Sequence, residues 1–160
     1  MKKYILTKTK KEWCGKTLFQ IKANIDFGNV KKGELGGFIE KEENLSQGDK
    51  SWVSGNAQVY GNARVYGNAQ VYDNARVYGD ARVSDDARVS DDAWVYGDAR
   101  VSGDAQVYGK LKLLAGFFFG YRYKKEEIKF AKIDGDYDLI YKGDAKFGEE
   151  EEMTGNEVES

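Results

Sequence analysis

The sequence predicts an all-β fold in which the chain winds into a flat-faced coil. A unit of six residues, Gly/Asp–Asn/Asp–Ala–Arg/Gln/Trp–Val–Tyr/Ser, repeats nine times without insertion from Gly55 to Tyr108. Within each unit Ala and Val are two residues apart, and because side chains alternate between the two sides of a strand, both face one interior. The first two residues of the unit then interrupt the alternation, and Gly and Asn adopt left-handed backbone at low cost. A strand and a corner therefore alternate every six residues.

Other repeat architectures fit this pattern poorly. Six is not a multiple of the 3.6 residues in a helical turn, and the unit is rich in Val and Gly. Propellers and leucine-rich arrays need units of about 20–45 residues. The unit instead resembles that of the hexapeptide-repeat family, whose fold is a left-handed parallel β-helix. The layout GGFIE, then NLS, then GNARVYGNA resembles the form of this family found in small phage and prophage proteins. The resemblance implies three units in each triangular coil.

The sequence divides into four predicted parts. Residues 1–50 form an N-terminal β cap that includes a hairpin over residues 3–23, and residues 51–120 form the β-helix of about four coils. Residues 121–148 contain a second hairpin, which turns at Asp134–Gly135. The acidic residues 149–160 form a disordered tail. At the end of the β-helix, Leu111 and Leu113, then Phe117 and Phe119, continue the interior positions of Ala and Val.

Composition narrows the classes of function. The chain has 25 Lys and Arg against 27 Asp and Glu, whereas a general nucleic-acid binder carries a basic excess. It contains no histidine, the commonest general base and a common metal ligand, so we expect no enzyme activity, no cofactor and no metal. A single cysteine and the absence of a signal or membrane-spanning segment predict a soluble protein in the bacterial cytoplasm, with no membrane partner.

Residues 18 apart stack when three units form one coil, so the outward side chains separate onto three faces. The first face carries a row of tyrosines beside an arginine and a tryptophan, and the second face carries a row of arginines. Aligned exposed aromatic residues are typical of contact surfaces, and a guanidinium binds phosphate or carboxylate. The predicted ligand-binding or partner-binding residues are Tyr60, Tyr78, Tyr96, Trp94 and Arg76 on the first face, and Arg64, Arg82 and Arg100 on the second. Alternatively, the tyrosines are simply solvated, and corner aspartates (Asp80, Asp86, Asp98 and Asp104) partly neutralise the arginines.

For two further features of the sequence, a non-functional interpretation is favoured over metal binding or thiol chemistry. Asp85–Asp86 and Asp91–Asp92 could ligate Ca²⁺, but no ligand loop of EF-hand spacing surrounds them, and a solvated acidic edge is the favoured interpretation. Cys14 lies in a predicted polar turn without a histidine to form a thiolate pair, which favours an incidental residue.

These observations favour a non-catalytic, oligomeric binding protein. Its expected partners are further copies of itself and either a small anionic, nucleotide-like molecule or a host protein. The phage-like layout suggests an inhibitor of host defence. The alternatives are a purely structural, self-assembling module, a degenerate acyltransferase of the hexapeptide type, and a nucleic-acid mimic. Acyltransferases of the hexapeptide family use a histidine base and an interrupting loop, and the mimic would show rows of Asp without interleaved arginines.

Overall fold

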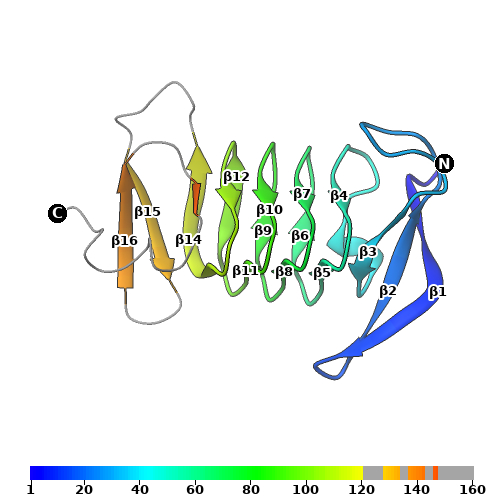
Figure 1. Cartoon of the computed structure of the whole chain (residues 1–160), viewed down its shortest axis with the longest axis horizontal. Helices are drawn as coiled ribbons and strands as arrows, with labels where there is room; N and C mark the ends of the chain where they lie inside the picture. Colours follow the sequence, from blue (N-terminus) through cyan, green and yellow to red (C-terminus); the bar gives the residue numbers. More distant parts are fainter. Residues whose placement is uncertain (121–127, 134–136, 143–145, 148–160) are drawn as a thin grey trace.

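The centre of the protein is a parallel β-helix of four coils (Figure 1). The computed structural model describes residues 1–120, 128–133, 137–142 and 146–147, and no α-helix occurs in this part of the chain. Each coil contributes one strand to each of three faces, and strands 18 residues apart pair in parallel. The predicted parallel β-helix of about four coils is therefore confirmed.

The strands divide among the faces as the 18-residue spacing predicts. In order along the first face lie β3 (Leu35–Ile39), β5 (Gln58–Val59), β8 (Arg76–Val77), β11 (Trp94–Val95) and β14 (Lys112–Gly120). The second face contains β6 (Arg64–Val65), β9 (Arg82–Val83), β12 (Arg100–Gly103) and the end of β14. The third face contains β4 (Trp52–Val53), β7 (Gln70–Val71), β10 (Arg88–Val89), β13 (Gln106–Val107) and β17 (Lys146–Phe147).

The interior contains the alanines and valines of the repeat. Every alanine from Ala57 to Ala105 and every valine from Val53 to Val107 is at most 1% exposed. Leu111 and Leu113 extend this column and are fully buried. Burial of methyl groups in a continuous column supplies the hydrophobic stabilisation that short two-residue strands cannot provide alone.

The corners are held by side chains that bridge successive coils. The first corner residue has a positive φ, which glycine adopts without strain, as Gly61 and Gly79 do. At three corners an aspartate with φ between 56° and 58° replaces it, namely Asp73, Asp85 and Asp91. Each accepts a hydrogen bond from the backbone N–H of the residue 18 positions later, at 3.0–3.3 Å. This contact between coils offsets the strain of a non-glycine residue in the left-handed region.

The N-terminal cap adds an antiparallel layer to the first face. Strands β1 (Tyr4–Trp13) and β2 (Lys16–Ala23) form the predicted hairpin, β2 pairs antiparallel with β3, and β3 pairs in parallel with β5. Parallel pairing therefore begins at β3, inside the range predicted as a cap. The short 3-10 helix η1 (Glu42–Asn44) follows, and the buried Asn44 donates hydrogen bonds to the carbonyls of Gly61 and Ala63.

A partly buried ion pair fastens the N-terminus to the first coil. Lys3 is 2% exposed, and its Nζ donates to the Ser51 carbonyl at 2.7 Å and lies 3.4 Å from Asp49 Oδ1. The other oxygen of Asp49 accepts the Gly67 N–H at 2.7 Å. Partial burial acts to raise the pKa of Asp49, but hydrogen bonds from Ser51, Ser46 and the Gly67 N–H hold this pKa below its ordinary value of 3.8. Asp49 therefore favours the folded state when ionised.

The lowered pKa of Asp49 predicts a loss of stability in acid. Its contribution is fully present above the ordinary value of 3.8 and is lost as the pH falls through the lower folded value. We expect the melting temperature of the wild type to fall over this range, and that of Asp49→Asn to start lower and fall less. Glu40 also has a lowered pKa, so the comparison with the variant isolates the share of Asp49. Parallel melting curves for both proteins at every pH would contradict the assignment.

The C-terminal end departs from the predicted register. Val101 pairs with Phe118, which is fully buried, whereas Phe117 pairs with Arg100 and is 60% exposed. The prediction that Phe117 faces the interior is therefore wrong, and Phe118 takes the interior position instead. Phe118 follows Leu113 by five positions instead of the six between successive valines of the repeat, because β14 runs through the corner as one strand and pairs with both β11 and β12. The missing corner residue shifts the alternation.

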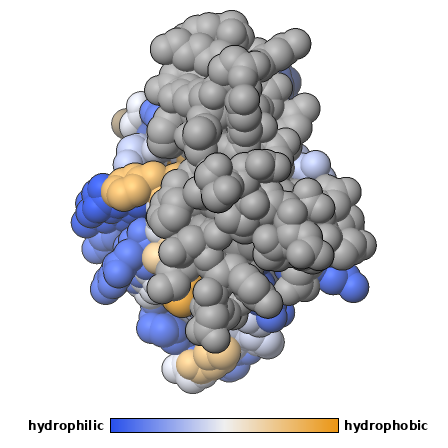
Figure 2. Space-filling model, turned by 90° about the vertical axis from the view of Figure 1, so that its left-hand side faces the viewer, coloured by the Kyte–Doolittle hydropathy of each residue, from blue (hydrophilic) through white to orange (hydrophobic). Residues whose placement is uncertain are grey.

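Beyond β14 the described strands form the predicted C-terminal hairpin. Strands β15 (Ile128–Ile133) and β16 (Tyr137–Lys142) pair antiparallel, and β15 also pairs with β14. The predicted acidic tail, residues 149–160, lies outside the described residues. Seen from this end, the visible residues coloured by hydropathy are mostly hydrophilic (Figure 2). None of the helices described has the length and apolar character needed to cross a membrane.

Candidate functional site

The tyrosine row of the first face forms the predicted ladder. Tyr60, Tyr78 and Tyr96 each follow the valine of a first-face strand, and neighbouring ring centroids are 5.0 Å apart. The planes differ by 2° for the first pair and 10° for the second, so the rings are stacked. Stacking follows from the parallel register, which places identical side chains one coil apart.

The second row of the first face mixes cationic and aromatic side chains. Gln58, Arg76, Trp94 and Lys112 pair in register along it. The Arg76 guanidinium lies 5.1 Å from the centroid of the Trp94 ring, and Lys112 Nζ lies 4.5 Å from the same ring. Trp94 also packs edge-on against Tyr78, at 6.2 Å. Of the predicted residues, the structure thus brings together Tyr60, Tyr78, Tyr96, Trp94 and Arg76.

The tip of the β1–β2 hairpin adds two residues that the sequence did not assign to this site. Trp13 Nε1 donates a hydrogen bond to the Tyr60 hydroxyl at 3.1 Å, and the Arg76 guanidinium lies 4.0 Å from the Trp13 ring centroid. Lys11 Nζ lies 3.9 Å from the Phe38 ring centroid. The only local signal was an aromatic residue beside a polar turn. The spacing of the repeat carries no information on where the hairpin lies.

Contact with the hairpin changes the role of Tyr60. Its side chain is only 6% exposed, and burial raises the pKa of its hydroxyl although the hydrogen bond from Trp13 acts to lower it. Tyr60 is therefore covered by the protein's own hairpin, and Tyr78 and Tyr96 are the partly exposed members of the ladder. The prediction of a row of three exposed tyrosines is therefore corrected to two partly exposed ones and one buried one.

A groove of about 370 Å³ opens beside the second row. It is lined by Lys11, Asn56, Gln58, Asn74, Arg76, Asp92 and Trp94. Burial lowers the pKa of Lys11, and the nearby charge of Arg76 lowers it further. Neither cation forms an ion pair with a carboxylate of the described residues. Gln58 is 6% exposed, and its Oε1 has no hydrogen-bond partner there. The groove thus combines two unpaired cations, an indole and an unsatisfied amide.

The arginines of the second face form a separate row. Arg64 pairs with Arg82, and Arg82 with Arg100, and all three side chains are exposed. They lie on a different face from the tyrosine ladder, so the predicted residues form two separate groups, as the 18-residue spacing indicates. A shallow hollow of about 290 Å³ includes Arg64, Arg82 and Tyr66, and Arg100 lies over Phe117 at 5.4 Å.

The corner aspartates Asp80 and Asp86 bond to side chains of neighbouring coils. No ion pair joins Arg64, Arg82 or Arg100 to any carboxylate in the part of the chain that the structure describes. Asp80 accepts a hydrogen bond from the Asn62 amide at 3.1 Å, and Asp86 from the Asn68 amide at 3.0 Å. The carboxylates thus link successive corners.

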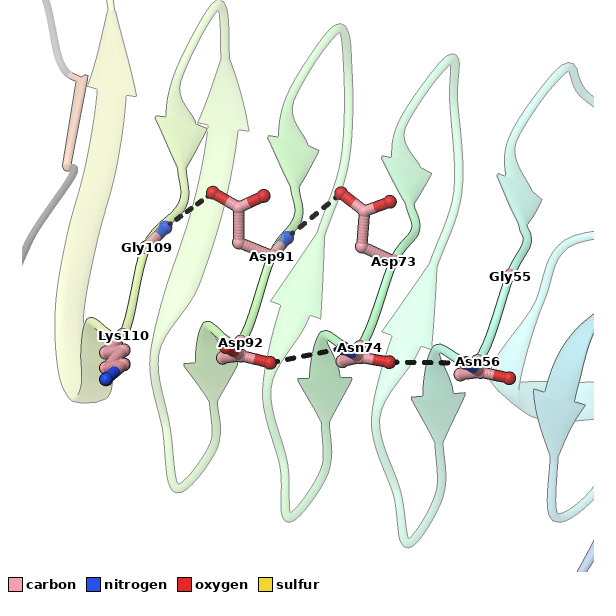
Figure 3. A pocket seen from close by; sticks show the side chains of 8 residues that line it. All are labelled: Gly55, Asn56, Asp73, Asn74, Asp91, Asp92, Gly109 and Lys110. Atoms are coloured by element: carbon pink, nitrogen blue, oxygen red, sulfur yellow. Dashed lines mark hydrogen bonds between the residues drawn. The ribbon is translucent and has the colours of Figure 1, made fainter.

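The acidic corner between the third and first faces has the same organisation (Figure 3). An open groove of about 650 Å³ runs along it, and the side chains of Asn56, Asn74 and Asp92 are joined by hydrogen bonds of 3.3 Å. Asp73 and Asp91 accept backbone N–H groups. Among the described residues, no three Asp, Glu or Cys side chains are grouped to hold a metal ion. Cys14, which the sequence analysis considered as a reactive thiol, lies exposed in the hairpin turn with φ 50°.

Comparison with known proteins agrees with the repeat geometry. The family model described as the YdcK beta solenoid repeat matches four overlapping segments, residues 57–71, 69–84, 81–97 and 93–109. No curated protein matches the chain. The matched segments cover the hexads that build the coils of the β-helix, while the hairpin that completes the first-face groove lies outside them. Residues 57–109 are thus similar to the YdcK beta solenoid repeat, and the protein is a β-solenoid.

Proposed function

We propose that the protein is a non-catalytic binding protein that captures a planar, anionic small molecule, of nucleotide-like chemistry, in the first-face groove. The carrying observation is Arg76, whose guanidinium contacts the indoles of Trp13 and Trp94 and has no carboxylate partner among the described residues. The aromatic contacts fix the orientation of the guanidinium and leave its N–H donors available for an anion.

The groove offers complementary contacts to both parts of such a ligand. Lys11 and Arg76 line it and supply positive charge for a phosphate or carboxylate. Trp94 lines the groove and supplies an apolar surface for the planar base. The amides of Asn56 and Asn74 can then contact the polar edge of the ring.

The phage-like layout of the sequence suggests where such binding acts. We propose that this protein acts in the cytoplasm of an infected bacterium, where it inhibits host defence by sequestering a nucleotide signal. Stacked outward rows such as Tyr78–Tyr96 also suit self-association, so we expect a homo-oligomer. As an alternative to capturing a nucleotide, the protein would bind and block a host defence protein through the same face.

The substitution Arg76→Gln tests the groove. Its matched control is Arg88→Gln, since Arg88 is exposed and pairs in register between Gln70 and Gln106 on the third face. We expect a panel of mono-, di- and cyclic nucleotides to contain a ligand that raises the melting temperature of wild type and Arg88→Gln by roughly 5–10 °C at a hundredfold excess over Kd. Arg76→Gln should lose affinity by about tenfold or more, because a charged hydrogen bond contributes about 1.5–3 kcal/mol.

Native mass spectrometry of protein purified from an infected host supplies the second readout. The proposal expects an oligomer that retains a small molecule, and Arg76→Gln should lose that molecule. An oligomer without ligand, together with no thermal shift for any nucleotide, would support the structural, self-assembling alternative. Turnover of acyl-CoA would instead support the acyltransferase.

A further inference from the structure

The second face combines exposed cationic and aromatic side chains. Its repeat strands have two outward positions, one on either side of the interior valine. The first position carries Arg64, Arg82 and Arg100, and the second carries Tyr66, Ser84 and Ser102. Tyr66 is 39% exposed, and Phe117, which continues the arginine row in register, is 60% exposed. Exposed arginine and aromatic side chains on one surface are typical of protein–protein contacts.

Acidic corners border the arginine row on both sides. Asp80 lies two residues before Arg82, and Asp86 lies four residues after it. Both carboxylates are exposed, and within the described residues neither forms an ion pair with an arginine. A polyanion along the arginine row, such as a nucleic-acid strand, would meet these carboxylates at both edges and be repelled. The face therefore suits a partner that itself carries rows of both charges.

A second copy of this chain presents such rows at the same spacing. Successive arginines are one coil apart, about 4.8 Å, in both copies. A two-fold axis can bring two identical faces together if it runs either along the coils or across them. An axis across the coils places the arginine rows against each other, and their like charges repel. An axis along the coils instead places each arginine row opposite the row of Tyr66 and the two serines.

The arrangement along the coils is complementary in shape. Arg82 lies opposite Ser84 of the second copy, which is small and only 8% exposed, so there is room for the long arginine side chain. Arg64 lies opposite Tyr66 of the second copy, where the guanidinium can stack on the phenol ring. A single exposed contact of this kind contributes little, but the row repeats it on successive coils and the two-fold axis doubles each one.

We propose that two copies of the protein form a two-fold dimer through their second faces, with Arg82 of each copy between Asp80 of its own chain and Asp86 of the other. This inference rests on the proposed homo-oligomer and names its contact surface, in place of the Tyr78–Tyr96 row. The dimer contact uses no residue that lines the first-face groove.

Charge reversal on either side of this contact tests the proposal. Sedimentation velocity of the wild type at about 100 µM, well above a micromolar Kd, should show a dimer. Arg82→Glu should raise the Kd of the dimer by about tenfold or more, because it places a third carboxylate between two aspartates. Asp86→Arg should act in the same way, because it brings two guanidinium groups together. Arg88→Glu is the control, since Arg88 is exposed on the third face between Gln70 and Gln106, and it should keep the wild-type Kd.

Mixing the two variants distinguishes a direct contact from an indirect effect. In a mixed dimer the two reversed charges attract at one contact, and the other contact keeps the wild-type pair of Arg82 and Asp86. An equimolar mixture of Arg82→Glu and Asp86→Arg should therefore dimerise with nearly the wild-type Kd, although neither variant does so alone. Reversed charges within one chain cannot explain this result, because no chain carries both substitutions.

The proposal is overturned if the wild type is a monomer or a trimer, since a two-fold contact joins only two copies. It is also overturned if Arg82→Glu keeps the wild-type Kd, if the mixture does not restore the dimer, or if Tyr78→Ala with Tyr96→Ala is the variant that dissociates it. Arg76→Gln should dimerise as the wild type does, so the result for the first-face groove is obtained separately.

Discussion

Val83→Asp is expected to unfold the β-helix. Val83 is fully buried in the middle of the interior column, where it pairs in register with Val65 above and Val101 below. An aspartate there places an unpaired charge among methyl groups, at a cost of several kcal/mol, which is a large share of the stability of a domain. The β-sheet signal in circular dichroism at room temperature should be lost or strongly reduced.

Arg82→Asp is the matched control for this experiment. Arg82 precedes Val83 in β9, but its side chain points outward and is exposed. The same introduced residue, one position away, should therefore shift the melting temperature by only a few degrees. A cooperative melt of Val83→Asp at the wild-type temperature would show that the assignment of the interior is wrong.

Gly36→Ala is expected to destabilise the junction between the cap and the first coil. A Cβ at residue 36 would lie 2.6 Å from both Ile21 Cγ1 and the Val53 carbonyl oxygen, and 2.7 Å from Trp52 Cζ2. One of these neighbours is backbone and the indole is packed on two sides, so the strain cannot relax cheaply. Overpacking of this kind typically costs about 1–3 kcal/mol, and urea denaturation should show a loss at the upper end of that range.

Gly48→Ala provides the control, because a Cβ at residue 48 meets no atom within 4 Å. Its midpoint in urea should match the wild type. If Gly36→Ala also matched the wild type, β3 would have to lie further from β4 than the structure places it. The two adjacent glycines of the GGFIE segment thus have a packing role, since a Cβ at residue 37 would likewise lie 2.8 Å from the Ala57 carbonyl oxygen.

The periodic part of the fold was predictable because one rule applies at every position. Alternation within each hexad defines interior and exterior, the Gly-Asn pairs define corners, and an 18-residue spacing assigns each outward side chain to a face. The stacking of Tyr60, Tyr78 and Tyr96 follows from that spacing alone. The rule fails at Phe117 and Phe118, where one corner residue is missing. Nothing in the local composition shows that the next interior position comes after five residues instead of six.

The candidate site was predictable only where the repeat builds it. Arg76 and Trp94 lie in register because they are 18 residues apart, but Trp13 and Lys11 reach the same groove through the long β1–β2 hairpin. The orientation of that hairpin depends on packing among Gly36, Ile21 and Trp52, which no periodic pattern encodes. Sequence likewise shows the charge of corner aspartates such as Asp80 and Asp86, but not the amide that each one meets.

The contacts of the corners also determine which insertions and deletions in the sequence can add or remove coils. The side chains of Asn56, Asn62 and Asn68 each bind the residue 18 positions later, and Asp73, Asp85 and Asp91 each accept an N–H from the same distance. A duplication or deletion of 18 residues therefore preserves every one of these partnerships, whereas a change of six or twelve rotates all later rows onto a different face. Variation in coil number can thus lengthen a binding row without rebuilding it, and the coil is the unit in which this surface can grow.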